Sequence, residues 1–189
     1  MKRPQWNRQK VEEILAREFA AARRKQPKVV WFGVRGYFED SMGKPDQNDR
    51  GIYDDAFFLI SPVCFKSFNA NTDPSRSGTN KNIGKGYPVL QPGIYDYKIG
   101  IHGLSRPKDK QYRALVQAGQ VTIKRDGSDK TERGFFCING HRGGINGTSS
   151  EGCQTTLRDQ WPEFFETVEI ELEKFGQNII PYCLIEQQG

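Results

Sequence analysis

The sequence predicts a mainly β fold, a barrel or a sandwich, with one helix at the N-terminus and another after Cys153. Short runs of β-branched and aromatic residues recur along the chain, and clusters of Gly, Pro and Asn separate them. These runs follow one another without the regular helix alternation of a parallel sheet, which argues against Rossmann-type and TIM-type folds. Apolar residues at helical spacing stand out in two segments only.

Each expected helix has recognisable ends. The first covers about Asn7 to Lys25, with Asn7 as its N-cap and Pro27 ending it. Its polar face carries basic side chains: Arg8, Lys10, Arg17, Arg23, Arg24 and Lys25. The second helix covers about Pro162 to Phe175, since proline suits the first helical position and Gly176 suits the stop.

The expected strands cover residues 29–37, 52–68, 93–103, 121–127, 135–139 and 178–185. A break near Pro62 would divide the second of these runs into two strands. Residues 69–86 are polar and glycine-rich, which predicts a long loop such as a lid or a binding loop. With no internal repeat and no second domain, residues 1–189 form a single domain that begins with a basic helical segment over residues 1–27.

Composition limits the possible partners. The chain has 189 residues, 35% of them hydrophobic, which is enough for a core without disulfides or metals. No apolar run approaches the roughly 20 residues that span a membrane, and no signal peptide is visible, so we expect synthesis in the cytoplasm. The net charge of +5 comes without an RNP, zinc-finger or helix-turn-helix pattern. We therefore expect a monomer with no nucleic-acid partner.

The four cysteines lie far apart and form no C-x-x-C pair, which argues against a zinc site. We expect no metal and no cofactor. Cys64, Cys137 and Cys183 each fall in an apolar, strand-like run and are predicted to be buried structural thiols. Cys153 differs, because its neighbours are Ser, Glu, Gly and Gln.

The segment from His141 to Cys153 has the composition of a nucleophile site. A cysteine nucleophile needs a base and nearby backbone N–H donors. We predict Cys153 as the nucleophile, His141 as the base, and the N–H groups of Gly152 and Cys153 as the oxyanion hole. A backbone carbonyl near Arg142 or Gly143 would fix the tautomer of the histidine.

Four further residues are expected around the substrate: Ser150, Glu151, His102 and Gly143. Ser150 would also orient the loop by hydrogen bonding to its backbone. His102 is a rival base, and its alternative interpretation is a hydrogen-bonded histidine at the end of a strand.

The order of these residues is informative. Papain-like peptidases place the cysteine before the histidine, whereas both histidines here precede Cys153. Asn139-Gly140-His141-Arg142-Gly143 followed by Ser150-Glu151-Gly152-Cys153 resembles the histidine-glycine and Ser/Thr-x-Gly-Cys elements of the L,D-transpeptidase (YkuD-like) catalytic domain. Leu90-Gln91-Pro92-Gly93-Ile94-Tyr95 resembles the Pro-x-Gly-x-aromatic stretch that opens the barrel of that family.

The resemblance covers about residues 88–160 and implies a catalytic core over residues 88–189. It implies a β-sandwich-like barrel, an acyl-enzyme on Cys153 and, as substrates, the stem peptides of peptidoglycan. By position, His141 would be the base and Gly152 part of the oxyanion region. Glu151 stands where the family has histidine or threonine and would repel an incoming carboxylate. Hydrolysis therefore stays open beside transpeptidation.

Such a substrate places the activity at the periplasm or the cell wall, after export or release. A bacteriophage lysis protein or an antibacterial effector would reach the wall without a signal peptide. Two alternatives remain. A sortase-like enzyme would use His102, Cys153 and Arg158, although the Thr-Leu-x-Thr-Cys signature is missing. In a non-catalytic wall-binding or structural module, the segment around Cys153 would be only a turn with a thiol.

Overall fold

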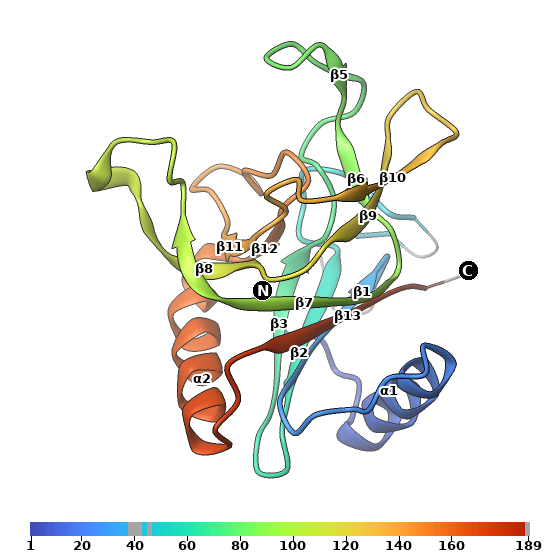
Figure 1. Ribbon diagram of the computed structural model, residues 1–189, viewed down its shortest axis with the longest axis vertical. Coiled ribbons are helices and arrows are strands. Elements are labelled where there is room, and N and C mark those ends of the chain that lie inside the picture. Colours follow the sequence, from blue (N-terminus) through green and yellow to red (C-terminus); the bar gives the residue numbers. More distant parts are fainter. Residues whose placement is uncertain (38–42, 45–46, 188–189) are drawn as a thin grey trace.

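A closed barrel of eight strands forms the centre of the protein, in the order β1-β13-β7-β8-β11-β12-β3-β2 (Figure 1). The computed structural model describes residues 1–37, 43–44 and 47–187. The barrel strands are β1 (Val30–Arg35), β2 (Asp55–Ile60), β3 (Phe65–Asn71), β7 (Gly93–His102), β8 (Tyr112–Gln117), β11 (Gly140–Arg142), β12 (Gln154–Thr156) and β13 (Ile180–Glu186). The expected mainly β class is confirmed, and the fold is a barrel.

Smaller elements surround the barrel. Above one end lie a three-stranded sheet and a hairpin: β6 (Pro88–Leu90), β9 (Val121–Arg125) and β10 (Thr131–Gly134), then β4 (Thr79–Asn80) and β5 (Lys85–Gly86). The helices are α1 (Arg8–Ala21), α2 (Trp161–Lys174) and the short 3-10 turns η1 (Lys108–Lys110) and η2 (Arg158–Gln160). In the described residues no helix is long and apolar enough to cross a membrane.

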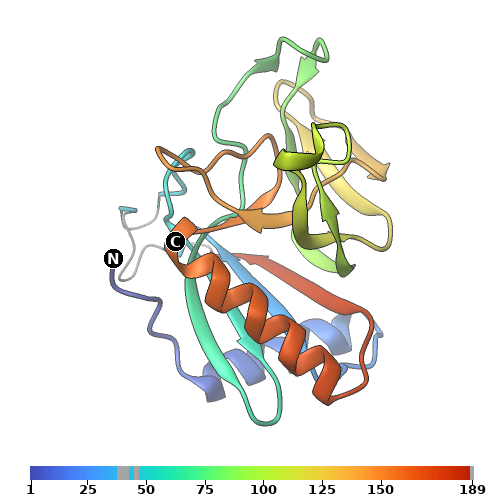
Figure 2. The same ribbon diagram turned by 90° about the vertical axis from the view of Figure 1, so that its left-hand side faces the viewer.

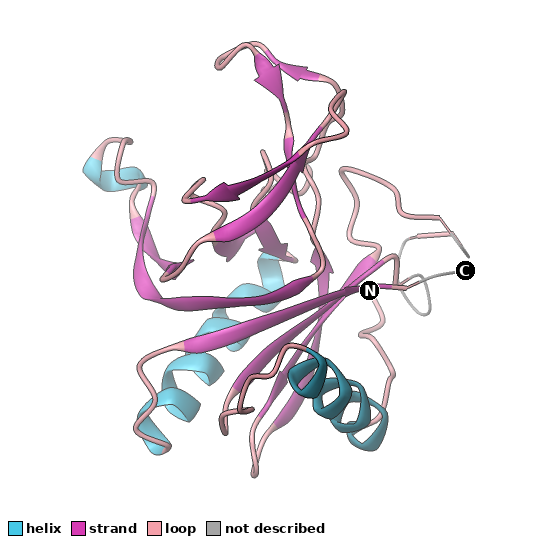
Figure 3. Ribbon diagram, turned by 45° about the vertical axis from the view of Figure 1, so that its right-hand side comes forward, coloured by secondary structure: helices cyan, strands magenta, loops and turns pink. Residues whose placement is uncertain are grey.

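The two long helices cover opposite sides of the strands, as Figures 2 and 3 show. Successive side chains of a strand point to opposite faces. In β1, Val30 and Phe32 therefore join the apolar cluster under α1, whereas Trp31 joins the cluster that fills the barrel and meets α2. The ring of Trp31 stacks on that of Tyr182, with 3.8 Å between centroids. Burial on both faces explains the unbroken apolar run of β1.

Both helices occur where the sequence predicts them, but the first is shorter. The Asn7 side chain caps α1 by accepting the Lys10 N–H at 2.9 Å. The helix ends at Ala21, because Arg23 adopts a left-handed φ of 52° and its N–H bonds back to Ala20. The expectation that Pro27 ends this helix, and that it reaches Lys25, is wrong.

The second helix agrees with its expected bounds. It begins at Trp161 with Pro162 in its first turn, and Gly176, at φ 60°, follows its end. The expected division near Pro62 is also confirmed, since β2 and β3 form an antiparallel hairpin.

Two other strand expectations fail. Residues 135–139 are not a strand, because Cys137 has a left-handed φ of 57°. The Gln117 side chain satisfies this segment instead, its Oε1 accepting the N–H groups of Phe136 and Ile138 at 3.0 and 2.8 Å. Residues 69–86 are not one loop either, since β3 extends to Asn71 and the β4–β5 hairpin follows. Strands β4, β5, β6, β8, β10, β11 and β12 were not expected.

Candidate active site

Strands β11 and β12 run side by side in parallel; His141 lies in β11, and Cys153 directly precedes β12. Gly140 pairs with Gln154, and His141 pairs with Thr155. Gly140 lies against Trp31 of the barrel core, so Gly140 and Gln154 face the interior. Because side chains alternate along a strand, His141 points to the opposite face, and Cys153 directly precedes β12. The register thus places the predicted base opposite Thr155, two residues beyond the predicted nucleophile on the neighbouring segment.

The thiol of Cys153 is partly buried and contacts backbone on two sides. The Asn139 N–H donates to Sγ at 3.5 Å, and Sγ lies 3.4 Å from the Cys137 carbonyl oxygen. Burial raises the pKa of Cys153 to about 11, although the Asn139 N–H opposes this shift. The group is therefore a neutral thiol at neutral pH and needs a base to react.

His141 is buried, and its tautomer is fixed. Its Nδ1 lies 2.7 Å from the carbonyl oxygen of Arg142 and 3.2 Å from the hydroxyl of Tyr112. A carbonyl oxygen only accepts, so Nδ1 carries the proton and Nε2 keeps its lone pair. The predicted contact with a backbone carbonyl near Arg142 is confirmed. Burial lowers the pKa of His141 to about 3, which keeps the imidazole neutral.

The second histidine lies against the first. The ring of His102, at the end of β7, stacks on that of His141 with 4.1 Å between centroids. The Asn139 amide lies 3.2 Å from His102 Nδ1, and burial lowers the pKa of His102 to about 4. In the described part of the chain neither imidazole hydrogen bonds to the thiol. Such contacts are often long in unliganded enzymes and tighten with substrate.

The loop before Cys153 is held from within. Ser150 Oγ donates to the Cys153 carbonyl at 2.7 Å and accepts the Gly152 N–H at 3.0 Å, as predicted for Ser150. Ser75 Oγ accepts the Ser150 N–H at 2.8 Å. Gly152 has a φ of 127°, and a Cβ there would lie 2.5 Å from the Pro88 carbonyl oxygen. Only glycine fits this position.

These bonds correct the predicted oxyanion hole. The Gly152 N–H is already bound to Ser150 and is not available to a substrate. The Cys153 N–H has no hydrogen-bond partner among the residues that the structure describes. Of the two expected donors, one therefore remains.

The other predicted residues divide into buried and exposed positions. Gly143 is buried, and a Cβ there would lie 1.7 Å from the Tyr53 hydroxyl, so it shapes the loop from inside. The guanidinium of Arg142 lies 4.2 Å above the ring of Tyr112. Glu151 is exposed beside Cys153, where a substrate would meet it. Arg158 donates to the Gly143 carbonyl at 3.4 Å rather than to the thiol.

No model of a known protein family matches this chain, and neither does any characterised protein. The case for a function therefore rests on the geometry described above and on the resemblance of the motif.

The other thiols separate into three environments. Cys183 is buried under α1, as predicted, and Cys64 is half-buried. Cys137 is exposed, so its prediction as a buried thiol is wrong, and the left-handed turn at this residue is the reason. The described residues contain no group of three or more His, Cys, Asp or Glu side chains arranged to hold a metal ion.

Sequence analysis did not identify four residues that support the candidate site: Tyr112, Gln117, Ser75 and Gln154. Each lies far along the chain from at least one group that it contacts. No local pattern signals such long-range hydrogen bonds, and strand β8, which supplies two of these residues, was itself not expected.

Proposed function

We propose that this protein is a peptidoglycan-directed cysteine enzyme of the L,D-transpeptidase-like type. The observation that carries the proposal is the proximity of Cys153 and His141 along the parallel pair β11–β12, with the His141 tautomer fixed by its neighbour's carbonyl. The barrel class and the internal bonds of Ser150 agree with the family that the motif resembles. The substrate class comes from that resemblance.

In the proposed reaction, Cys153 Sγ attacks the carbonyl carbon of a stem-peptide bond, and His141 Nε2 accepts the thiol proton. The raised pKa of Cys153 and the lowered pKa of His141 favour the neutral pair at rest. Proton transfer therefore accompanies formation of the C–S bond rather than preceding it. The Cys153 N–H stabilises the oxyanion, and the imidazolium then protonates the leaving amine. The acyl group passes to water or to an amine.

His102 has a different part in this proposal. Its ring packs on His141 and its Nδ1 accepts from Asn139, so it holds the base in place. The exposed carboxylate of Glu151 lies beside the thiol and repels carboxylate-bearing acceptors, which favours hydrolysis over cross-linking. A stem-peptide substrate places the action of this monomer at the periplasm or the cell wall, as for a phage lysis protein or an antibacterial effector.

The test is incubation with purified muropeptides and mass analysis of the products. Wild type is expected to shorten or join stem peptides, and Cys153→Ala to leave them unchanged. Cys183→Ala is the matched control, since it removes a thiol from the opposite face and should retain the activity. Muropeptides that stay unchanged with the wild-type protein would contradict the proposal, and the masses of the products would identify the bond.

A further inference from the structure

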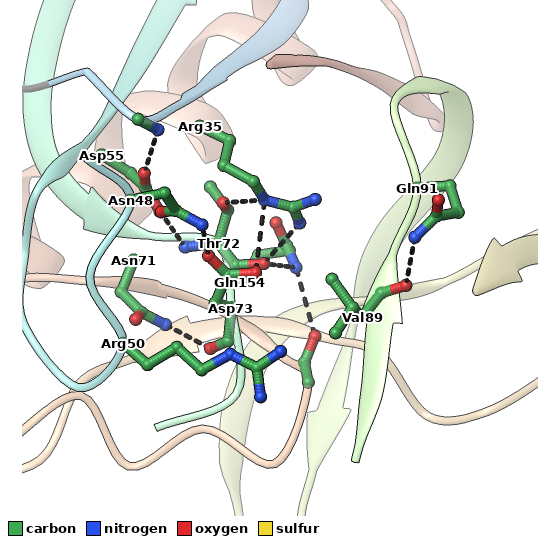
Figure 4. A network of polar contacts seen from close by, with 12 residues as sticks. Arg35, Asn48, Arg50, Asp55, Asn71, Thr72, Asp73, Val89, Gln91 and Gln154 are labelled. Carbon is green, nitrogen blue, oxygen red and sulfur yellow. Dashed lines mark hydrogen bonds and ion pairs between the residues drawn. The ribbon is translucent and has the colours of Figure 1, made fainter. Parts of the chain in front are cut away.

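Gln154, the residue after the candidate nucleophile, points into the barrel and is completely buried. Its Nε2 donates to the carbonyl oxygens of Thr72 at 3.0 Å and Gly152 at 3.2 Å. Its Oε1 accepts from the Tyr182 hydroxyl at 2.8 Å. Figure 4 shows Gln154 beside Thr72. Since carbonyl oxygens only accept, the orientation of the amide is fixed.

The anchor for this amide is rigid. Arg35, which is 2% exposed, donates to both the carbonyl and the hydroxyl of Thr72, at 2.9 and 3.0 Å (Figure 4). The Thr72 N–H donates to Asp55 at 2.6 Å, and Arg35 pairs with Asp73 at 3.3 Å. A buried network in which each of these groups has a partner holds its members in one arrangement.

The contact with Gly152 determines the direction of the next amide. In a trans peptide, the C=O and N–H groups lie in one plane and point in opposite directions. Gln154 holds the Gly152 carbonyl toward the interior, so the N–H of Cys153 points away from it. Outward is also the face of β11 that carries His141.

We propose that Gln154 is a positioning residue, which orients the Gly152–Cys153 peptide so that the Cys153 N–H meets the carbonyl oxygen of a bound acyl donor. The inference rests on the proposed function and deepens it. It gives a role to the buried polar residue that follows the nucleophile. It also places the oxyanion at a single backbone donor, since the N–H of Gly152 bonds to Ser150.

Two reactions of the Cys153 thiol distinguish a positioning role of Gln154 from a purely structural one. Acylation by p-nitrophenyl acetate forms an S–C bond and breaks the bond to p-nitrophenolate through an oxyanion, whereas iodoacetamide alkylates Sγ by displacing iodide without one. Both would be followed at Cys153 by peptide mass mapping. Gln154→Leu is expected to slow acylation by about 10²-fold, the usual effect of losing one oxyanion donor. Its alkylation rate should stay within about threefold of wild type.

Two more variants support the comparison. Tyr182→Phe keeps the ring in the core but removes the hydroxyl that holds Gln154, and is expected to slow acylation about tenfold. Thr156→Val is the matched control on the same strand, since its buried Oγ1 has no hydrogen-bond partner in the described residues. It should change both rates by less than about threefold. Thermal melting would confirm that each variant is folded.

The outcomes are distinct. Acylation and alkylation that fall together, or that both stay unchanged in Gln154→Leu, would overturn the positioning role. A wild-type thiol that is alkylated but never acylated would overturn the proposed function. Amide hydrogen exchange would then test separately whether the Cys153 N–H points outward. Fast exchange of the Cys153 N–H, together with slow exchange of the Gln154 N–H, supports the outward orientation, because the Gln154 N–H bonds to the Asn139 carbonyl. A protected Cys153 amide would refute it.

Discussion

Two outer faces of the barrel each hold a thiol, and their surroundings differ. Under α1, Cys183 lies in an apolar cluster, and burial raises its pKa to about 12. On the β11–β12 face, burial raises the pKa of Cys153 to about 11. The raised pKa therefore does not distinguish the two sites. The difference is the Asn139 N–H on the thiol of Cys153 and a neutral imidazole on the neighbouring strand β11.

The barrel interior shows a similar contrast. One part is aromatic, with Trp31, Phe57 and Tyr97 packed around Tyr182. The hydroxyl of Tyr182 leads into the polar part, where it donates to Gln154. Gly33 makes this possible, because a Cβ there would lie 2.3 Å from that hydroxyl. The aromatic part stabilises the barrel, and the polar part fixes the loop that carries the thiol.

The largest expected effect is the difference in activity between the variants that lack one thiol or the other. Cys153→Ala should lower the rate of ester cleavage by more than about 10³-fold, since the nucleophile is gone. Cys183→Ala should leave the rate within about twofold of wild type and cost about 1 kcal/mol of unfolding free energy, because it removes one buried atom. Steady-state kinetics and urea unfolding measure both. Equal losses of activity in the two variants would remove the distinction between the faces.

The two histidines near Cys153 are expected to contribute unequally to the reaction. His141→Gln should lower kcat by about 10²- to 10⁴-fold, the range for a general base. His102→Gln should lower it by about tenfold or less, because it only supports the ring of His141. The reverse order would make His102 the base.

A smaller effect concerns the pH dependence of the thiol. Because burial raises the pKa of Cys153 to about 11, its alkylation rate should rise roughly tenfold per pH unit above pH 7 and level off near pH 11. Brief iodoacetamide pulses with peptide mapping would give this profile. A plateau below pH 8 would mean that Cys153 is already a thiolate in the resting protein. That result would contradict a resting state with a neutral thiol and a neutral His141 imidazole.

A different effect concerns acid stability. In the folded protein the pKa is about 3 for His141 and about 4 for His102, below the ordinary value of 6.5. Between each folded value and 6.5, the unfolded chain therefore binds more protons than the folded chain. Stability is therefore lost as pH falls below 6.5, by about 1.4 kcal/mol per pH unit for the buried His141 and by less for the half-buried His102, which solvent screens. The raised pKa of Asp54, about 6, acts in the opposite direction.

Urea unfolding between pH 4.5 and 7 would measure this contribution. The difference between wild type and a His102→Gln, His141→Gln double variant cancels the effect of Asp54, which is common to both. The variant should lose less stability on acidification. Parallel curves for the two proteins would contradict the burial of neutral imidazoles on this face.

Local chemistry explains which features could be predicted from the sequence. The cap at Asn7, the stop at Gly176 and the bonds of the Ser150 hydroxyl involve residues within a few positions of one another, so their patterns are visible in the chain. The fixed tautomer of His141 likewise depends on the adjacent Arg142.

The features that sequence analysis missed depend on distant residues. The turn at Cys137 is supported by Gln117, and the amide of Gln154 is held by Thr72, 82 positions away. Strand β8 lacks a clear alternation, since its pattern is set by its neighbours β7 and β11. Such contacts are determined by tertiary packing, which no local pattern records.

Carbapenem labelling tests most directly whether the β11–β12 face is a nucleophile site. Folded wild-type protein would be exposed briefly to a carbapenem at neutral pH, and its four cysteine peptides would then be mapped by mass spectrometry. The account predicts one acyl adduct, on Cys153, although Cys137 is more exposed. Equal labelling of all accessible cysteines, or labelling of Cys137 alone, would contradict it.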